Sequence, residues 1–265
     1  KQRGAPGPPP GPDNCFFCLS NPNIATHLIT SIGNECYLTT ARGPLPTSTS
    51  FPSLGFPSHI LIIPFTHTPA LNIISEASSR QPIYAEMQRY RAALHAMLAA
   101  KADNALGAVT WEISRSNGVH IHWQFLPASA EMVEAGLVEA AFKVEAENSQ
   151  YPKFEAPAAP QDPSAEPGDY FRVRIWRPGP AAPEAAAAGA EKKEDADAGK
   201  ETTLVLPLTP DFRFDLQFGR RVMAKLMQLD SRVNWKDAVQ GPAEEEKEAG
   251  AFKEAFKRFD FSLEE

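Results

Sequence analysis

The stretch Val119-His120-Ile121-His122-Trp123-Gln124-Phe125-Leu126 decides how the fold of this chain is interpreted. Its polar residues alternate with apolar ones, and successive side chains of a strand point to opposite faces. The pattern therefore predicts a strand with His120, His122 and Gln124 on one face and an apolar face that packs on a core. An imidazole near neutral pH can attack phosphorus, transfer protons or bind a metal. The same pattern also fits a strand with two half-exposed histidines and no chemistry.

Length and composition set the class of protein. The chain has 265 residues, which suggests one large domain or two smaller ones, and 43% are hydrophobic, enough for a real core. It has no run of eighteen apolar residues and no signal peptide at its start, so we expect no membrane span and no membrane partner. A net charge of -7 argues against non-specific coating of nucleic acid but leaves room for a local basic site.

Three segments of biased composition predict how the chain is divided. Residues 1–13 are rich in Pro and Gly and look like a linker through which a fragment of a longer protein is entered. A Pro-rich connector covers residues 151–167. Residues 177–202 consist mainly of Ala, Pro, Gly, Glu and Lys, which predicts a disordered insert in a hairpin.

The remaining segments predict alternating strands and helices. A hairpin around Gly33-Asn34 is followed by the apolar strand 59–64 and by a helix over residues 79–100, in which His95 is expected to be solvated or capping. Further strands are predicted at residues 108–113, 119–126, 169–176 and 203–207, and further helices at 131–147, 214–229 and 243–261.

Cys15-Phe16-Phe17-Cys18 is a candidate metal-binding turn. Two thiolates two residues apart can hold one zinc ion, although a complete site needs two more ligands. His67, just after the strand 59–64, is a candidate third ligand. The alternatives are two buried small side chains and an ordinary loop histidine. The odd number of cysteines favours a reducing compartment over a disulfide scaffold.

Two other regions are candidates for phosphate or RNA contacts. The polar turn 114–118 can present backbone amides to a phosphate, chiefly at Ser116, Asn117 and Gly118. The region from 213 to 236 is locally basic and contains Trp235, so it could hold an RNA backbone and stack a base, or it could be a solvated helix face. Its predicted RNA-binding residues are Arg213, Arg220, Arg221 and Lys225.

Three motifs together resemble the histidine-triad (HIT) superfamily: Cys15-x-x-Cys18, His59-Ile-Leu-Ile-Ile-Pro-x-x-His67 and His120-x-His122-x-Gln124. The resemblance implies zinc bound by Cys15, Cys18, His67 and His120, and His122 as the nucleophile that forms a covalent nucleotidyl intermediate. Gln124 replaces the third histidine, as in galactose-1-phosphate uridylyltransferases, so the change does not exclude catalysis. Its amide can donate to a phosphate oxygen but cannot serve as acid or base near pH 7.

A closer resemblance covers nearly the whole chain. Six segments look like the two C-terminal domains of the CwfJ family: Cys15-Phe-Phe-Cys-Leu, His27-Leu-Ile-Thr-Ser-Ile-Gly, Cys36-Tyr-Leu, Pro167-Gly-Asp-Tyr-Phe, Phe214-Asp-Leu-Gln-Phe-Gly-Arg and Phe259-Asp-Phe-Ser-Leu. The family is linked to the late spliceosome and to intron-lariat turnover. The run Leu-Gln-Phe-Gly-Arg resembles the branch associated with the lariat debranching enzyme.

The resemblance implies an α+β fold. We expect a HIT-like antiparallel sheet with helices over residues 14–130, and a second, smaller α+β domain over residues 131–265 packed against it. The first functional hypothesis is a nuclear module that binds phosphates of branched or lariat RNA, acts with spliceosome components and assists the debranching enzyme. The second is a nucleotidyl hydrolase or transferase that uses His122 and Gln124. The third is a purely structural, zinc-stabilised scaffold. The altered triad and the resemblance to a cofactor of another enzyme favour the first.

Overall fold

All the strands described belong to one antiparallel sheet. The computed structural model describes residues 9–158, 160–179 and 199–264; the start of the predicted linker and most of the predicted insert lie outside these ranges. The order of the strands in the sheet is β1-β2-β3-β5-β4-β6-β7. Their bounds are β1 Ile29–Ile32, β2 Cys36–Thr40, β3 Ile60–Pro64, β4 Leu106–Ser114, β5 Trp123–Ser129, β6 Asp169–Arg177 and β7 Lys200–Leu208.

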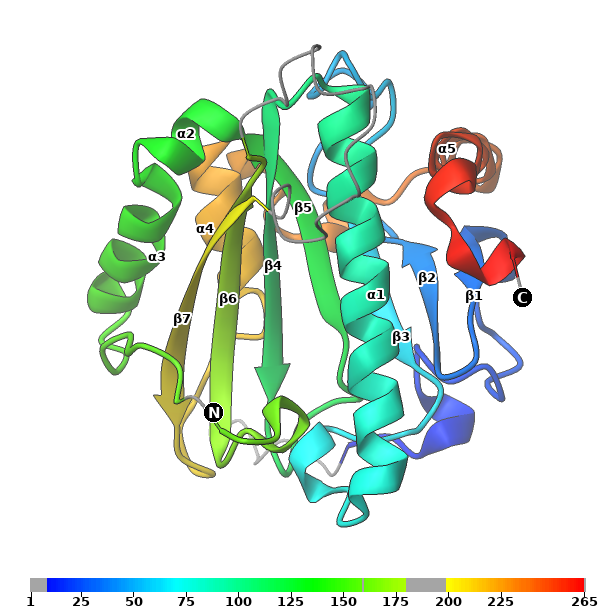
Figure 1. Ribbon diagram of the computed structural model, residues 1–265. Helices are drawn as coiled ribbons and strands as arrows, with labels where there is room; N and C mark the ends of the chain where they lie inside the picture. The colour runs from blue at the N-terminus through cyan, green and yellow to red at the C-terminus, as the bar shows by residue number, and fades with distance from the viewer. Residues whose placement is uncertain (1–8, 159, 180–198, 265) are drawn as a thin grey trace, which may run out of the picture.

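Helices cover both faces of this sheet and confirm the α+β class (Figure 1). The helices are α1 Ala77–Lys101, α2 Ala130–Glu134, α3 Leu137–Asn148, α4 Phe218–Leu226 and α5 Pro242–Phe256. One buried cluster joins α1 and α5 to residues of β2 to β6, and the other joins α3 and α4 to residues of β4 to β7. No helix in the described ranges has both the length and the apolarity needed to cross a membrane.

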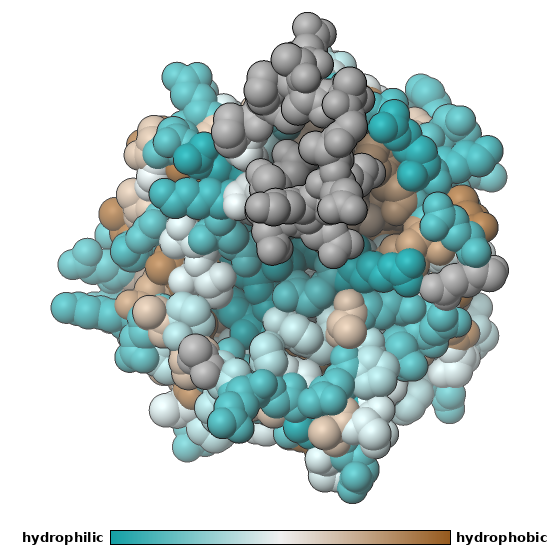
Figure 2. Space-filling view, in the orientation of Figure 1, coloured by the Kyte–Doolittle hydropathy of each residue, from teal (hydrophilic) through white to brown (hydrophobic). Residues whose placement is uncertain are grey.

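The spacing of apolar residues explains why α1 lies where it does. Ile83, Met87, Leu94 and Leu98 recur at helical intervals, and all four are buried against the sheet. His95, on the same helix, is also buried and stacks flat on Trp176, with ring centroids 4.1 Å apart. The prediction of a solvated or capping His95 is therefore wrong. The view in Figure 2 shows that the surface on this side is largely hydrophilic, with hydrophobic residues in small groups.

Several predicted elements differ in extent from those observed. The helix predicted over residues 131–147 is split into α2 and α3 at Gly136, whose φ of +72° is unfavourable for other residues. The insert predicted at 177–202 is shorter, because Arg177 ends β6 and Lys200 begins β7. The strand predicted at 119–126 begins only at Trp123, so His120 and His122 lie in the segment that enters β5.

The second half of the chain extends the sheet of the first half. β6 pairs with β4 from Ala108 opposite Trp176 to Ser114 opposite Tyr170. β7 then pairs with β6 along its whole length. The C-terminal helix α5 returns to the opposite end of the sheet, where it contacts β1 (Figure 1). Elements of the second half therefore lie at both ends of the sheet.

Candidate functional site

The four predicted metal ligands meet at one point. Cys15 and Cys18 lie on the turn after a short 3-10 helix, His67 follows β3, and His120 precedes β5. One ligand atom of each lies within 4.8 Å of those of the other three. Cys18 Sγ lies 3.0 Å from His67 Nδ1, and Cys15 Sγ lies 3.5 Å from His120 Nδ1. Two thiols and two imidazoles in this arrangement could hold a metal ion.

The surroundings of His120 suit a metal ligand. Its Nε2–H donates to the carbonyl oxygen of Pro64 at 3.0 Å, which leaves Nδ1 without a proton and directed at the sulfurs. Burial lowers the pKa of His120 to about 4, so the ring is neutral at physiological pH. Burial also raises the pKa of the Cys18 thiol to about 12. A bound cation would offset the cost of forming a thiolate there.

His122 is held in one tautomer. Its Nδ1 lies 3.0 Å from the carbonyl oxygen of His120, and because a carbonyl can only accept, Nδ1 carries the proton. Burial lowers the pKa of His122, so the ring is neutral and Nε2 presents a lone pair. Among the described residues no group forms a hydrogen bond with this Nε2. The nitrogen is therefore available to accept a hydrogen bond or to act as a nucleophile.

The amide of Gln124 is oriented by a histidine to which the sequence pattern assigned no role. The backbone N–H of Leu45 donates to His59 Nδ1 at 3.1 Å, so the proton of His59 is on Nε2. This Nε2–H donates to Gln124 Oε1 at 3.1 Å. The amide nitrogen of Gln124 is consequently the group left to donate to a ligand. Only the pairing of β3 with β5, which places Leu61 opposite Gln124, brings His59 into range.

Burial keeps His59 in the neutral state that this arrangement needs. The pKa of His59 is lowered to about 3, mainly by desolvation and to a smaller extent by the charge of Arg220. Arg220 and Gly219 belong to α4, which packs against Trp111 behind the site. A Cβ added at Gly219 would lie 2.6 Å from Trp111 Nε1. The second half of the chain thus closes the back of the site.

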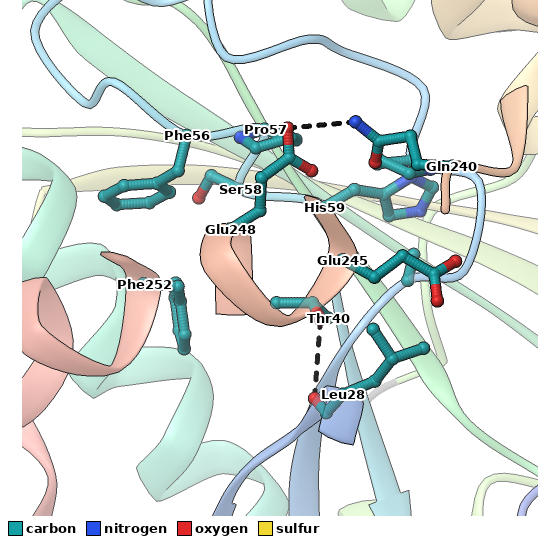
Figure 3. A pocket seen from close by; sticks show the side chains of 12 residues that line it. Leu28, Thr40, Phe56, Pro57, Ser58, His59, Gln240, Glu245, Glu248 and Phe252 are labelled. Carbon is teal, nitrogen blue, oxygen red and sulfur yellow. Dashed lines mark hydrogen bonds between the residues drawn. The ribbon is translucent and has the colours of Figure 1, made fainter. Parts of the chain in front are cut away.

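His59 also lines a small pocket between the two halves of the chain (Figure 3). Ser58, Gln240 and Glu248 also line it, and the side-chain amide of Gln240 donates a hydrogen bond to Glu248. Ser58 Oγ and Gln240 Oε1 are buried and have no hydrogen-bond partner among the described residues. Since buried polar atoms normally find a partner, we expect ordered water in this pocket.

Two backbone N–H groups of the predicted phosphate-binding turn already form hydrogen bonds within the protein. The backbone N–H of Ser116 donates to Asp169 Oδ1 at 2.8 Å. The N–H of Gly118 donates to the carbonyl oxygen of Arg115 at 3.0 Å. Asn117 between them is exposed. A phosphate at this turn would have to displace the Asp169 carboxylate from Ser116.

The predicted basic surface is largely an internal network. Arg220 is 3% exposed and donates to the backbone carbonyls of Arg232 and Val233, so it stabilises the fold and does not face a ligand. Arg221 and Lys225 both form ion pairs with Glu145. Arg213 is exposed and has no ion pair within the described ranges. The internal role of Arg220 depends on tertiary contacts that local charge density does not reveal.

Comparisons with known proteins agree on one family. Relatives include the CWF19-like protein mug161 of Schizosaccharomyces pombe, which is 39% identical over 95% of this chain and 39% of its own length. CWF19-like protein DRN1 of Saccharomyces cerevisiae is 30% identical over 96% of this chain and 48% of its own length. Human CWF19-like protein 1 is 26% identical over 95% and 39%. The chain thus spans less than half the length of these relatives.

Two family descriptions match consecutive parts of the chain. The description "Protein similar to CwfJ C-terminus 2" matches residues 168–262. The description "Protein similar to CwfJ C-terminal" matches residues 9–143, which is more than half of the chain and includes all four candidate metal ligands, His59, His122 and Gln124. Because of this match, the chain belongs to the family of proteins similar to the CwfJ C-terminus.

Proposed function

We propose that this chain is an RNA-processing module that binds the phosphates of branched or lariat intron RNA in the nucleus. In this proposal it acts with spliceosome components and assists the lariat debranching enzyme. Membership of the CwfJ family supports the general role. We infer the binding site from the fixed amide of Gln124, which lies two positions from the neutral ring of His122.

The two side chains offer complementary hydrogen-bonding groups. A phosphate oxygen only accepts hydrogen bonds, and the Gln124 amide nitrogen donates them. His122 Nε2 accepts, so it suits a hydroxyl group such as the ribose 2′-OH next to that phosphate. The 2′-OH is the group that distinguishes RNA from DNA. We therefore expect the site to prefer RNA to DNA of the same sequence.

We further propose that the metal at Cys15, Cys18, His67 and His120 is zinc in a structural role. Zinc prefers four tetrahedral nitrogen and sulfur ligands, and a site with four protein ligands leaves no position open for substrate. When bound, the ion would stabilise the two thiolates. His122 is not part of the ligand set, so it stays free to meet RNA.

A second candidate function rests on the tautomer of His122. With the proton on Nδ1, Nε2 could attack a phosphorus atom and form a P–N bond, while the leaving oxygen departs with the electron pair of the P–O bond it breaks. Gln124 would donate to the developing charge. Water would then release the nucleotide from the histidine. This candidate is a histidine-triad nucleotidyl hydrolase or transferase.

One experiment separates the candidates. Fluorescence anisotropy would measure the binding of branched RNA, linear RNA and matching DNA to the wild type and to the His122→Ala, Gln124→Ala and Gln81→Ala variants. Gln81 is an exposed amide on α1 and serves as the control. We expect Gln124→Ala to weaken RNA binding about tenfold, the cost of one hydrogen bond to a charged phosphate oxygen, and His122→Ala to weaken it about fivefold, the cost of a hydrogen bond to a neutral hydroxyl. Gln81→Ala should leave RNA binding unchanged.

The same samples report on catalysis. Radiolabelled adenylylated and branched RNA would be incubated with the proteins and run on a denaturing gel. A labelled protein band that His122→Ala abolishes would establish the nucleotidyl candidate. RNA affinity that neither site variant alters would contradict the proposed site. Absence of both RNA binding and labelling would leave a zinc-stabilised scaffold.

A further inference from the structure

The turn between the two metal-binding cysteines also contacts His122. The ring of Phe17 lies over the ring of His122, with centroids 4.4 Å apart and planes inclined by 37°. The same phenyl ring meets His120 edge-on at 6.1 Å. Phe17 thus touches one candidate metal ligand and the candidate RNA-binding histidine at once.

The backbone of Phe17 is fixed on both sides. Its N–H donates to Cys15 Sγ at 3.4 Å, so the position of the residue depends on where the ligand sulfur is held. Its carbonyl oxygen accepts a hydrogen bond from the hydroxyl of Tyr37 on β2 at 2.7 Å. The phenyl ring is therefore placed by a metal ligand and by the sheet together.

Two contacts of the His122 ring lead to residues of the metal centre. His122 lies before the first residue of β5, so strand pairing does not fix it. Its Nδ1–H donates to the carbonyl of His120, a candidate metal ligand. Its ring packs on Phe17, which lies in the turn between the candidate ligands Cys15 and Cys18. Both contacts that orient the ring therefore lead back to the metal centre.

We propose that Phe17 is a positioning residue through which metal binding organises His122. With the four ligands gathered, Phe17 and the His120 carbonyl hold the imidazole in the Nδ1–H tautomer with Nε2 outward. Without the metal, the turn loosens and the ring becomes free to rotate. Coupling between two binding equilibria is reciprocal, so RNA bound at His122 must tighten the metal site by the same factor.

The chain offers closely matched controls. Phe16 is the neighbouring aromatic on the same turn, but it is 78% exposed and has no ring contact with either histidine among the described residues. Phe16→Leu therefore changes the same turn without removing the stack. Phe17→Leu keeps an apolar side chain and removes the aromatic ring, and Phe17→Tyr restores the ring.

The first test is spectroscopic and needs no RNA. Nitrogen-15 NMR of the imidazole rings of the full chain, loaded with zinc at pH 7.5, reports the tautomer of His122. We expect the Nδ1–H form in the wild type, Phe16→Leu and Phe17→Tyr, and a mixture of both tautomers in Phe17→Leu. A single Nδ1–H form in a folded, zinc-loaded Phe17→Leu protein would overturn the proposal.

The second test measures reciprocity and rests on the proposed function. Zinc affinity would be determined by chelator competition with and without saturating branched RNA. We expect RNA to tighten zinc binding about fivefold or more in the wild type and Phe16→Leu, and less than twofold in Phe17→Leu. RNA that binds the wild type without changing its zinc affinity would refute the coupling. If no RNA binds, the proposed function fails, while the NMR test still decides the role of Phe17.

Discussion

At the scale of single residues, burial fixes the protonation state of the histidines on which the site depends. His59 lies in the interior, and its pKa is lowered by burial to about 3, so its single proton stays on the nitrogen that orients Gln124. His95 lies on the buried face of α1, where burial and the charge of Arg91 also lower its pKa. Neutral buried imidazoles lower the free energy of unfolding at acidic pH, because the unfolded chain can take up protons that the folded chain cannot.

The sign of the resulting pH dependence is fixed. Both histidines have a folded pKa below the unfolded value of about 6.5, so their contribution to stability is complete above that pH and is lost as the pH falls below it. While it stays neutral in the folded protein, each such histidine lowers the free energy of unfolding by roughly 1.4 kcal/mol for every unit by which the pH falls below about 6.5. We expect urea denaturation to show a marked loss of stability between pH 7 and pH 5.

The variant His95→Phe isolates one of these contributions. It keeps the aromatic stack on Trp176 and removes the buried Nε2, which has no hydrogen-bond partner among the described residues. Between pH 6.5 and 5 we expect the variant to lose less of its free energy of unfolding than the wild type loses. Equal losses for the two proteins would show that His95 becomes protonated without unfolding.

At the scale of elements, local pattern predicts most of the architecture but not the entry to β5. Helical spacing identified α1, and Gly33-Asn34 identified the first hairpin. The alternating pattern begins at residue 119, before the strand itself, which starts at Trp123. His120 is drawn out of the sheet by contacts with Cys15, Cys18 and Pro64, more than fifty residues away in sequence. No local period encodes such long-range contacts.

The candidate site was predictable to the same degree. Spacing and resemblance singled out His122, Gln124 and the four candidate metal ligands, which the structure gathers at one point, because each belongs to a short motif. The role of His59 required the register of β3 and β5. The burial of Arg220 required the docking of α4. Both depend on how distant elements pack.

A substitution in the turn 15–18 has a clear expected effect on metal binding. Cys18→Ser removes one of the four gathered side chains, so we expect it to abolish the proposed binding of one equivalent of zinc. At a free zinc concentration 1,000 times the dissociation constant, the loss lowers the free energy of unfolding by about 4 kcal/mol. Metal analysis and urea denaturation would measure both effects.

The third cysteine supplies the control for this experiment. Cys36 is fully buried on β2 and is not among the gathered ligands. Cys36→Ala should keep one equivalent of zinc even if packing is weakened. A Cys18→Ser protein that retains its metal would contradict the assignment of the ligands.

Helix α4 is the element that closes the back of the site, and Gly219 sets how closely it approaches. Gly219→Ala would place a methyl group 2.6 Å from Trp111 Nε1, and overpacking of this kind costs about 1–3 kcal/mol. Gly250, in the middle of α5, has open space around it, so Gly250→Ala should instead stabilise the protein by about 0.5–1 kcal/mol. Opposite shifts of the urea midpoints are expected. A Gly219→Ala protein as stable as the wild type would show that α4 can move away from Trp111.

At the scale of the whole molecule, a buried charge network joins the two halves of the sheet. Glu112 on β4 is 2% exposed and accepts hydrogen bonds from Trp123 and from Arg172 on β6. Arg174 lies 3.5 Å from the same carboxylate and is equally enclosed. Burial alone would raise the pKa of Glu112, but the two guanidinium groups lower it, so the carboxylate remains charged. This network lies where the family match to residues 9–143 and the match to residues 168–262 share adjacent strands.

Removal of the Glu112 charge should therefore weaken the molecule as a whole. In Glu112→Gln, Arg174 stays buried without its anion while Arg172 keeps its ion pair with Glu166, and breaking such a group costs about 3–5 kcal/mol. The surface pair of Arg177 and Glu134 provides the control, because Glu134→Gln should cost under about 1 kcal/mol. Since one sheet runs through both halves, tryptophan fluorescence and circular dichroism should report a single coincident transition that moves to lower urea in Glu112→Gln. Two separated transitions in the variant would mean that the halves keep independent stability, and the charged layer would then join two units that fold separately.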